Sequence, residues 1–317
     1  MLTPATRHAS QPKEVDTENE AEVSGVADTA LWVAALRATE SKRANAIFSD
    51  PLAEMLAGKR GPMIARALYF SSMEPWGFVL RTSAIDRLIR EALHAGVDTV
   101  INLGAGLDSR PYRLDLPADL RWIEVDLPEL IDAKNSLLLN RAPKCHVERV
   151  GLDLRNLKER SQLFARIGAS SASTLLIAEG VIPYLPNDVV GGLAEELHAV
   201  PAFRRWILDF VNAGKRAMPR KWAKKLNAAP FLFQVNDWFE FFGNFGWRPQ
   251  VVVTTLDESV RMARPLPFDF PRGLVMRALP RDLRRRILSV SGAVLLERET
   301  PRRQAAVTPR EIPSLDT

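Results

Sequence analysis

The stretch VINLGAGLDSRPYRL, residues 100–114, begins with an apolar run typical of a buried strand and continues into a glycine-containing turn. Gly104 and Gly106 let the chain turn tightly and bring backbone N–H groups against a ligand, because a side chain at either position would block that approach. The same pattern opens the dinucleotide fingerprint G-x-G-x-x-G. Here Ser109 holds the third position and Pro111 follows closely. We therefore expect no helix that starts at the glycines and binds a pyrophosphate at its N-terminus.

Short apolar runs recur after this loop, separated by stretches with helical spacing or by loops. Alternation of this kind is typical of βαβ units, which form a parallel sheet with helices on both faces. We predict an α/β doubly wound fold with about seven strands, the last one antiparallel. The expected strands are 98–104, 121–126, 146–153, 174–180, 205–211, 249–256 and 292–299.

Asp126 ends the second expected strand, twenty residues after Gly106. A carboxylate at this place accepts hydrogen bonds from both hydroxyls of a ribose. The structural alternative is an aspartate that caps the helix expected from Leu127. The glycine loop upstream favours the ribose role.

Polar groups also follow the third and fourth expected strands. Asp153 is placed to accept the amino group of an adenine, and the backbone N–H of Leu154 to bond a ring nitrogen. Glu179 ends the fourth strand beside the same crevice. Open α/β sheets bind ligands outside the carboxyl ends of their strands, so these residues predict one adenosine site.

The termini differ in composition from the rest of the chain. Residues 1–22 and 300–317 are polar and poor in aromatic residues, and we expect flexible tails there. Between them we predict a single domain, 23–299, with an N-terminal helical cap (23–96) and a lid insertion (212–247). The cap is expected to hold helices near 27–38, from Asp50-Pro51, and over roughly 75–95. The insertion is rich in phenylalanine and tryptophan; most of these rings are expected to pack on the sheet, and some to cover a hydrophobic substrate.

The net charge is +5, and basic residues gather in 215–225 and 281–286. Neither run accompanies a recognisable nucleic-acid motif, so we interpret both as solvated helix faces and expect no nucleic-acid partner. The positive charge would steer an acidic small substrate. No apolar run approaches the roughly 20 residues of a membrane helix, and no secretory signal is visible.

Cys145 is the single cysteine, so no internal disulfide is possible, which fits a reducing compartment. We expect a cytoplasmic protein. A reactive nucleophile is one interpretation of Cys145, but its place in an expected strand favours a buried, unreactive thiol.

Five blocks of this sequence, in order, resemble the leucine carboxyl methyltransferase family. More narrowly, they are similar to its bacterial branch, which resembles the O-methyltransferases of tetracenomycin-type polyketide synthesis. The resemblance covers about residues 24–300 and implies a class I methyltransferase-like fold that binds S-adenosyl-L-methionine. The blocks are SKRANAIFSDPLAEML (41–56), RTSAIDRLI (81–89), VINLGAGLDSRPYRL (100–114), WIEVDLPELIDAK (122–134) and LIAEGVIPYL (176–185).

The resemblance implies roles at the methionine end of the cofactor. Arg81 matches the arginine that holds the cofactor carboxylate, and Lys42 matches a lysine nearby. Glu179 matches the acid beside the cofactor amino group, and Tyr184 the tyrosine on the substrate side, our catalytic candidate. A surface ion pair for Lys42 and a packed core tyrosine for Tyr184 are the structural alternatives.

The resemblance implies matching roles at the adenosine end. Gly104 matches the glycine that touches the cofactor, and Asp126 the ribose ligand. Asp153 and Leu154 match the pair that reads adenine.

We therefore expect an S-adenosyl-L-methionine-dependent O-methyltransferase acting on a small molecule, with a carboxylate or a phenolic hydroxyl of a secondary metabolite such as a polyketide as acceptor. The alternatives are a nicotinamide-dependent oxidoreductase, a protein C-terminal carboxyl methyltransferase, and a non-catalytic binding module. None of the four histidines (His8, His94, His146 and His198) is expected near the crevice, which favours a carboxylate that needs no general base. No metal-ligand spacing is present, so we predict no metal.

Overall fold

The computed structural model describes residues 23–69, 73–211, 226–264, 275, 278–280, 282–283 and 289–299. The expected tails, the basic run 215–225 and most of the run 281–286 lie outside these residues. The expected lid insertion is described only from residue 226.

Seven strands form one sheet in the order β3-β2-β1-β4-β5-β7-β6. β7 is antiparallel to both of its neighbours, and all other neighbouring strands are parallel. The predicted doubly wound sheet of about seven strands, with the last one antiparallel, is confirmed. The strands are β1 (Thr99–Leu103), β2 (Arg121–Asp126), β3 (His146–Gly151), β4 (Thr174–Ala178), β5 (Phe203–Val211), β6 (Trp247–Thr254) and β7 (Ser291–Arg298).

The strand order reverses between β1 and β4, the two central strands that pair with each other. Every residue of these two strands is buried. Burial on both faces explains why both segments have nearly continuous apolar sequences instead of alternating ones. The reversal also defines the edge at which a doubly wound sheet binds ligands.

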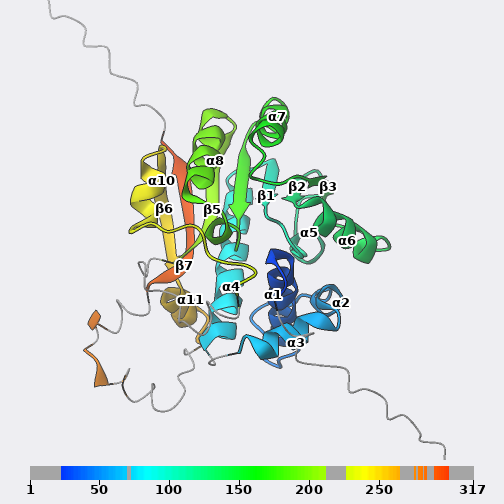
Figure 1. Cartoon of the computed structure of the whole chain (residues 1–317), viewed down its shortest axis with the longest axis vertical. Coiled ribbons are helices and arrows are strands. Elements are labelled where there is room, and N and C mark those ends of the chain that lie inside the picture. Colours follow the sequence, from blue (N-terminus) through cyan, green and yellow to red (C-terminus); the bar gives the residue numbers. More distant parts are fainter. Residues whose placement is uncertain are drawn as a thin grey trace, which may run out of the picture.

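Helices cover both faces of the sheet (Figure 1). On one face, α7 (Leu157–Gly168), α8 (Asn187–Ala199) and α10 (Trp238–Gly243) contribute side chains to the larger core cluster. On the other face, α4 (Met73–His94) packs its apolar side against the central strands. The remaining helices are α1 (Val26–Ser41), α2 (Ala53–Ala57), α3 (Arg60–Ala67), α5 (Arg110–Arg113), α6 (Pro128–Leu138), the 3₁₀ turn η2 (Ile182–Tyr184) and α11 (Thr255–Arg261).

The expected N-terminal helices are present, with one shifted start. α1 and α4 confirm the helices predicted near 27–38 and 75–95. The helix predicted from Asp50-Pro51 begins at Ala53, because the Asp50 carboxylate accepts from the backbone N of Leu52 at 3.2 Å and forms a turn ahead of the helix. α3 was not predicted.

α10 is the described helix of the expected insertion. Asp237 caps it by accepting hydrogen bonds from the N–H groups of Phe239 and Glu240. Trp238 and Phe242 are buried in the core, where Phe242 packs edge-on against Trp206 of β5 with ring centroids 5.2 Å apart. These rings therefore pack on the sheet, as expected for most of the insertion's aromatics.

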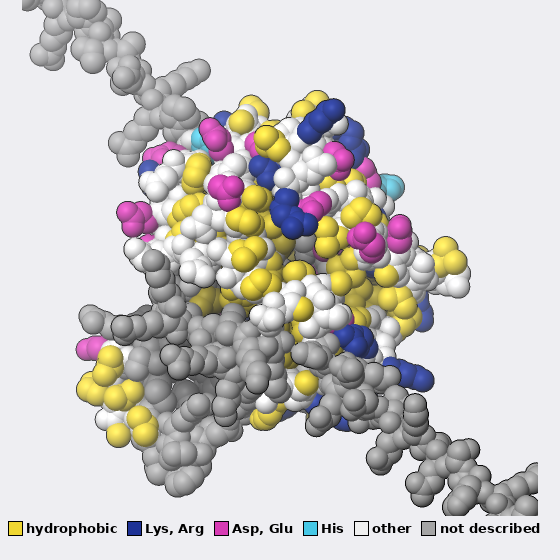
Figure 2. Space-filling model, viewed as in Figure 1, with side chains coloured by type: hydrophobic (Ala, Val, Ile, Leu, Met, Phe, Trp, Pro, Cys, Tyr) yellow, Lys and Arg dark blue, Asp and Glu magenta, His cyan; other side chains and the backbone are white. Residues whose placement is uncertain are grey.

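Basic and acidic side chains are interspersed among hydrophobic and neutral ones on the described surface that Figure 2 shows. Across the described part of the chain, no helix combines the length and the apolar character needed to cross a membrane.

Candidate functional site

A pocket opens at the carboxyl ends of β1, β2 and β4, where the strand order reverses, and α1 forms one of its walls. The empty space in it, open mouth included, is about 800 Å³. The lining comprises Val26, Ala27, Thr29, Ala30, Val33 and Arg37 of α1, Arg81 and Thr82 of α4, Asn102, residues 104–108 and Arg110, then Asp126, Leu127 and Leu130, and residues 179–181.

The glycines of the turn after β1 are required by close packing. Gly104 has a φ of +65°, and a Cβ added there would lie 2.5 Å from Cγ2 of Val181. Gly106 has a φ of +46°, and its Cβ would meet that of Ala30 at 3.3 Å. Any side chain would therefore be strained in the backbone and would push the pocket walls apart.

The sequence predicts that the backbone N–H groups of this turn face a ligand, but three of them bond within the chain. Those of Gly104 and Ala105 donate to the carbonyl of Val125 at 2.8 and 3.1 Å, and that of Gly106 donates to Oδ2 of Asp126 at 2.6 Å. The turn is tied to β2 by its own donors. The glycines thus provide space for a ligand, and these three N–H groups are already used within the chain.

Asp126 lies in the pocket wall with its carboxylate fixed by the backbone. Oδ2 accepts from Gly106 N, and Oδ1 accepts from Leu127 N at 2.7 Å. α6 has Leu127 as its N-cap, without a side-chain cap, so the alternative role of Asp126 as a helix cap is wrong. Burial raises the pKa of Asp126. A carboxylate accepts about four hydrogen bonds, so two sites remain for ligand hydroxyls.

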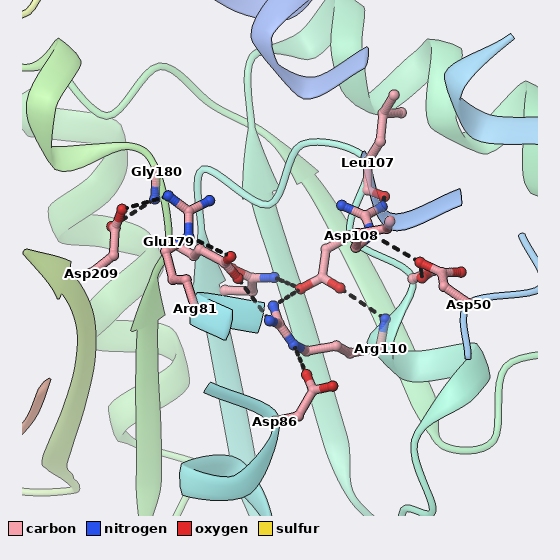
Figure 3. A network of polar contacts seen from close by, with 12 residues as sticks. Asp50, Arg81, Asp86, Leu107, Asp108, Arg110, Glu179, Gly180 and Asp209 are labelled. Atoms are coloured by element: carbon pink, nitrogen blue, oxygen red, sulfur yellow. Dashed lines mark hydrogen bonds and ion pairs between the residues drawn. The ribbon is translucent and has the colours of Figure 1, made fainter. Parts of the chain in front are cut away.

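Glu179 joins two arginines at the other end of the pocket (Figure 3). Oε1 accepts from Nε of Arg81 at 2.9 Å, and Oε2 lies 2.7 Å from Nη2 of Arg110. Burial alone raises the pKa of Glu179, but the positive charges of Arg110 and Arg81 outweigh it and hold the pKa below its ordinary value. Glu179 is therefore an ionised acceptor beside an arginine, an arrangement that suits both ends of an amino-acid zwitterion.

The ion pairs extend beyond the residues that the sequence singled out. Arg110 binds Asp86 through Nε and Asp108 through Nη1, both at 2.7 Å, while Asp209 of β5 accepts from Nη1 of Arg81 at 2.8 Å. Asp108 and Arg110 stand in the same 100–114 stretch as the glycines, but the sequence analysis predicted a role only for the glycines. Asp209 is a lone carboxylate in the apolar run of a fifth strand. Its place near the carboxyl end of that strand, where ligands bind in such sheets, is the sequence feature that points to the site.

Arg37 of α1 is a further lining residue that sequence reasoning missed. Its Nη2 donates to the carbonyl of Leu107 at 2.6 Å, and its Nε donates to Oδ2 of the buried Asp50 at 2.8 Å. Ser109 donates to the same Asp50 oxygen at 2.6 Å. Arg37 and Asp50 thus fasten the glycine turn to the N-terminal helices.

Four candidates from the sequence do not line the pocket. Lys42 forms an exposed ion pair with Glu54. Asp153 pairs with Arg155 at the surface, and Leu154 is buried in the core. Tyr184 packs edge-on against Phe231 with centroids 5.2 Å apart, and burial raises its pKa. The pocket thus brings together Arg81, Gly104, Gly106, Asp126 and Glu179.

The cysteine and the described histidines lie outside the pocket. Cys145 is buried, as expected, and burial raises the pKa of its thiol to about 11. His94, His146 and His198 are all described, and none lines the pocket. The described residues contain no group of three or more side chains suited to a metal ion.

Comparison with solved structures supports the fold. The crystal structure of an inferred methyltransferase of Thermobifida fusca superposes with a TM-score of 0.54 at 15% identity, covering 88% of this chain and 96% of that one. A DUF574 family protein of Streptomyces avermitilis gives a TM-score of 0.52, also at 15% identity, with 84% and 96% covered. The chain is consistent with a class I methyltransferase fold.

Sequence comparison is more specific. An inferred S-adenosyl-L-methionine-dependent methyltransferase of Streptomyces avermitilis is 36% identical over 59% of this chain and 69% of its own length. Another, from Mycolicibacterium paratuberculosis, is 30% identical over 81% and 90%. The relatives' names bear out the expected cofactor, S-adenosyl-L-methionine. The sequence model of the leucine carboxyl methyltransferase family matches residues 30–198. The chain belongs to the leucine carboxyl methyltransferase family.

Proposed function

We propose that this chain is an S-adenosyl-L-methionine-dependent O-methyltransferase of a small molecule, a carboxylate or phenol of a secondary metabolite such as a polyketide, in the tetracenomycin-type branch of its family. The observation that carries the proposal is that the glycine turn, Asp126 and the Arg81–Glu179 pair line one pocket. A ribose acceptor and a partner for each charge of an amino acid stand at the two ends of one pocket. S-adenosyl-L-methionine carries these groups in that order.

We propose the following roles for the residues that face the cofactor. Asp126 accepts the ribose hydroxyls with its two remaining acceptor sites, while Arg81 and Glu179 hold the carboxylate and the amino group of the methionine end. The glycine turn lets the cofactor approach the sheet, since a Cβ at Gly104 would strike Val181.

Lys42, Asp153, Leu154 and Tyr184 keep their proposed roles with the cofactor or the acceptor. None of the four lines the pocket. For Lys42 and Tyr184 the proposal rests on the family resemblance alone, and for Asp153 and Leu154 it rests on the resemblance and on their place after the third strand. In the same proposal, residues 23–299 form one domain with a helical cap and a lid at 212–247, in a reducing, cytoplasmic compartment that the single Cys145 favours.

When bound, the cofactor supplies an activated methyl group on a sulfonium, so the protein has to orient the acceptor and exclude water. None of the three described histidines lines the pocket, and the carboxylates at its methionine end are engaged in ion pairs. In the described lining, the carboxylate outside these ion pairs, Asp126, is assigned to the ribose, so no free proton acceptor is left for an alcohol. This favours an acceptor that is already ionised, such as a carboxylate, with a methyl ester as product.

Two alternative functions can be weighed against the same pocket. A nicotinamide-dependent oxidoreductase is disfavoured because the helix after the glycines, α5, is only four residues long and begins at Arg110, beyond the turn. Methylation of a protein C-terminal carboxylate is compatible with the family and with a described lining that leaves no free base.

Calorimetric titration with S-adenosyl-L-methionine tests the proposal. We expect micromolar binding by the wild type and binding weakened at least tenfold in Asp126→Ala, because the ribose loses its carboxylate partner. Glu258→Gln is the matched control: this buried carboxylate forms ion pairs away from the pocket and should leave the affinity unchanged. Binding of reduced nicotinamide cofactor in place of S-adenosyl-L-methionine would contradict the proposal.

The class of acceptor is tested on the product. Candidate acids and phenols are incubated with methyl-labelled cofactor, and the product is then treated with mild alkali. A methyl ester releases labelled methanol, whereas an aryl ether keeps its label. Retention of the label in the main product would overturn the preference for a carboxylate.

A further inference from the structure

Asp209 is a buried carboxylate to which the proposed function assigns no role. It lies on β5, where its neighbours Leu208 and Phe210 are core residues, and only 6% of its surface is exposed. β4 and β5 are parallel, with Ala178 opposite Leu208 as the last pair. Glu179 and Asp209 therefore follow that pair side by side, at the same edge of the sheet.

Each oxygen of Asp209 holds a different part of the site (Figure 3). Oδ1 accepts from the backbone N of Gly180 at 2.8 Å, and Oδ2 accepts from Nη1 of Arg81 at 2.8 Å. Gly180 has a φ of +68°, a conformation that side chains rarely adopt, so the chain turns sharply just after Glu179. Asp209 thus fixes both the turn that follows the acid and the arginine that the acid binds.

The charges show why this carboxylate matters to Arg81. The Arg81 side chain is only 13% exposed and lies between Glu179 on Nε and Asp209 on Nη1. Two carboxylates on different edges of a planar guanidinium fix its orientation, which one partner does not. Asp209 is absent from the pocket lining, so its effect on a ligand must pass through Arg81 and Gly180.

We propose that Asp209 is a positioning residue for the methionine end of the cofactor: it holds Arg81 and the Glu179–Gly180 turn in the arrangement that receives the amino-acid group. This inference rests on the proposed function. It predicts that loss of Asp209 weakens ligands that carry the methionine end and leaves ligands of the adenosine end unaffected.

The substitution Asp209→Asn removes one acceptor at nearly constant size. Both partners of Asp209 are N–H donors, and an amide offers one oxygen and one NH₂ group. One of the two donors must therefore face the NH₂ group and lose its hydrogen bond. We expect binding of S-adenosyl-L-methionine to weaken on the order of 10- to 100-fold, as for a lost hydrogen bond to a charged group.

The test compares two ligands by calorimetry, S-adenosyl-L-methionine and adenosine, which lacks the methionine end. For Asp209→Asn we expect the selective loss of the first and an unchanged affinity for the second. Arg81→Lys should show the same selectivity, and the double variant should lose less than the two single losses combined, because both act through one contact. Glu258→Gln should change neither affinity.

The outcomes separate this inference from the proposed function. Unchanged binding of S-adenosyl-L-methionine by Asp209→Asn, or an equal loss of both ligands, would overturn the role of Asp209 while the proposed function stands. A wild type that binds no S-adenosyl-L-methionine would overturn both. If Asp209→Asn does not fold, Asp209→Ser, which leaves room for a water between the two donors, is measured in its place with the same expectation.

Discussion

Arg110 is the residue on which most of the site's buried charges depend. Its three guanidinium nitrogens each bind a different carboxylate, those of Asp86, Asp108 and Glu179, all at 2.7 Å. The Arg110 side chain is only 3% exposed, and the carboxylates hold its pKa well above the ordinary value against the opposing effect of burial. The same arginine lowers the pKa of Asp108 and of Glu179.

We predict that Arg110→Met lowers the free energy of unfolding by roughly 3–5 kcal/mol, because removing one member of a buried ionic group leaves its partners without compensation. Urea unfolding followed by circular dichroism measures the change. Arg248→Met is the matched control, since Arg248 forms an ion pair with Glu299 in which both side chains are more than half exposed, and it should cost less than about 1 kcal/mol. Equal losses in the two variants would contradict the prediction.

The sequence pointed to pocket-lining residues whose signal is local and missed those whose position depends on tertiary pairing. Gly104 and Asp126 are recognisable because a strand, a turn and the next strand lie close together in the chain. Asp209 is 128 residues from Arg81, and nothing in the run RWILDFV shows which donors its carboxylate meets. Lys42 was chosen from the family resemblance, and nothing in the sequence around it shows that its ammonium pairs with Glu54 at the surface.

At the scale of elements, α1 is held to α3 by polar contacts at its start. The carboxylate of Asp28 accepts from the backbone N and the hydroxyl of Ser24, both at 2.7 Å, and from two nitrogens of Arg60 at 2.9 and 2.6 Å. The hydrogen bond from Arg60 is the main cause that lowers the pKa of Asp28 to about 2.

This carboxylate makes the stability of α1 depend on pH. An acid whose pKa falls on folding stabilises the folded state above its unfolded pKa, near 3.8, and loses that contribution as the pH falls through 2. We predict that Asp28→Asn lowers the melting temperature at pH 5 to 7 and that the difference from the wild type disappears toward pH 2. Thermal melts of both proteins at each pH measure this. A difference that stays constant from pH 7 to pH 2 would contradict it.

The elements themselves were predicted to different degrees. All seven strands were found. Five of them, β1, β2, β4, β5 and β7, are mostly buried and give strong apolar runs, whereas β3 and β6 are mostly only partly buried or exposed and were found from weaker runs at the expected spacing. The start of α2 was misplaced, since the carboxylate of Asp50 is used by Leu52, Ser109 and Arg37, and the last two are long-range partners. α3 was missed because it is only eight residues long and contains a glycine and a proline, so its stability depends on packing against α1 and α2.

At the scale of the whole molecule, the pocket joins segments that are far apart in the sequence. α1 supplies one wall, and the turns after β1, β2 and β4 supply the others. α1 has many contacts with α2 and α3 and few with the sheet layer, so the pocket lies between two groups of elements. A ligand in this pocket requires both groups to be folded and in contact, and the unfolded chain offers no such site.

We therefore predict that S-adenosyl-L-methionine stabilises the whole protein and protects α1 in particular. A ligand at about 100 times its Kd adds roughly 2.7 kcal/mol to the free energy of unfolding, which raises the melting temperature by a few degrees in a protein of this size. Hydrogen exchange should slow in residues 26–37 as well as around the glycine turn, because the bound cofactor links the α1 wall to the sheet. Asp126→Ala at the same cofactor concentration should show a smaller shift. Slower exchange confined to the sheet, with α1 unchanged, would mean that α1 does not close on the ligand and that the wall seen in the pocket is not part of the binding site.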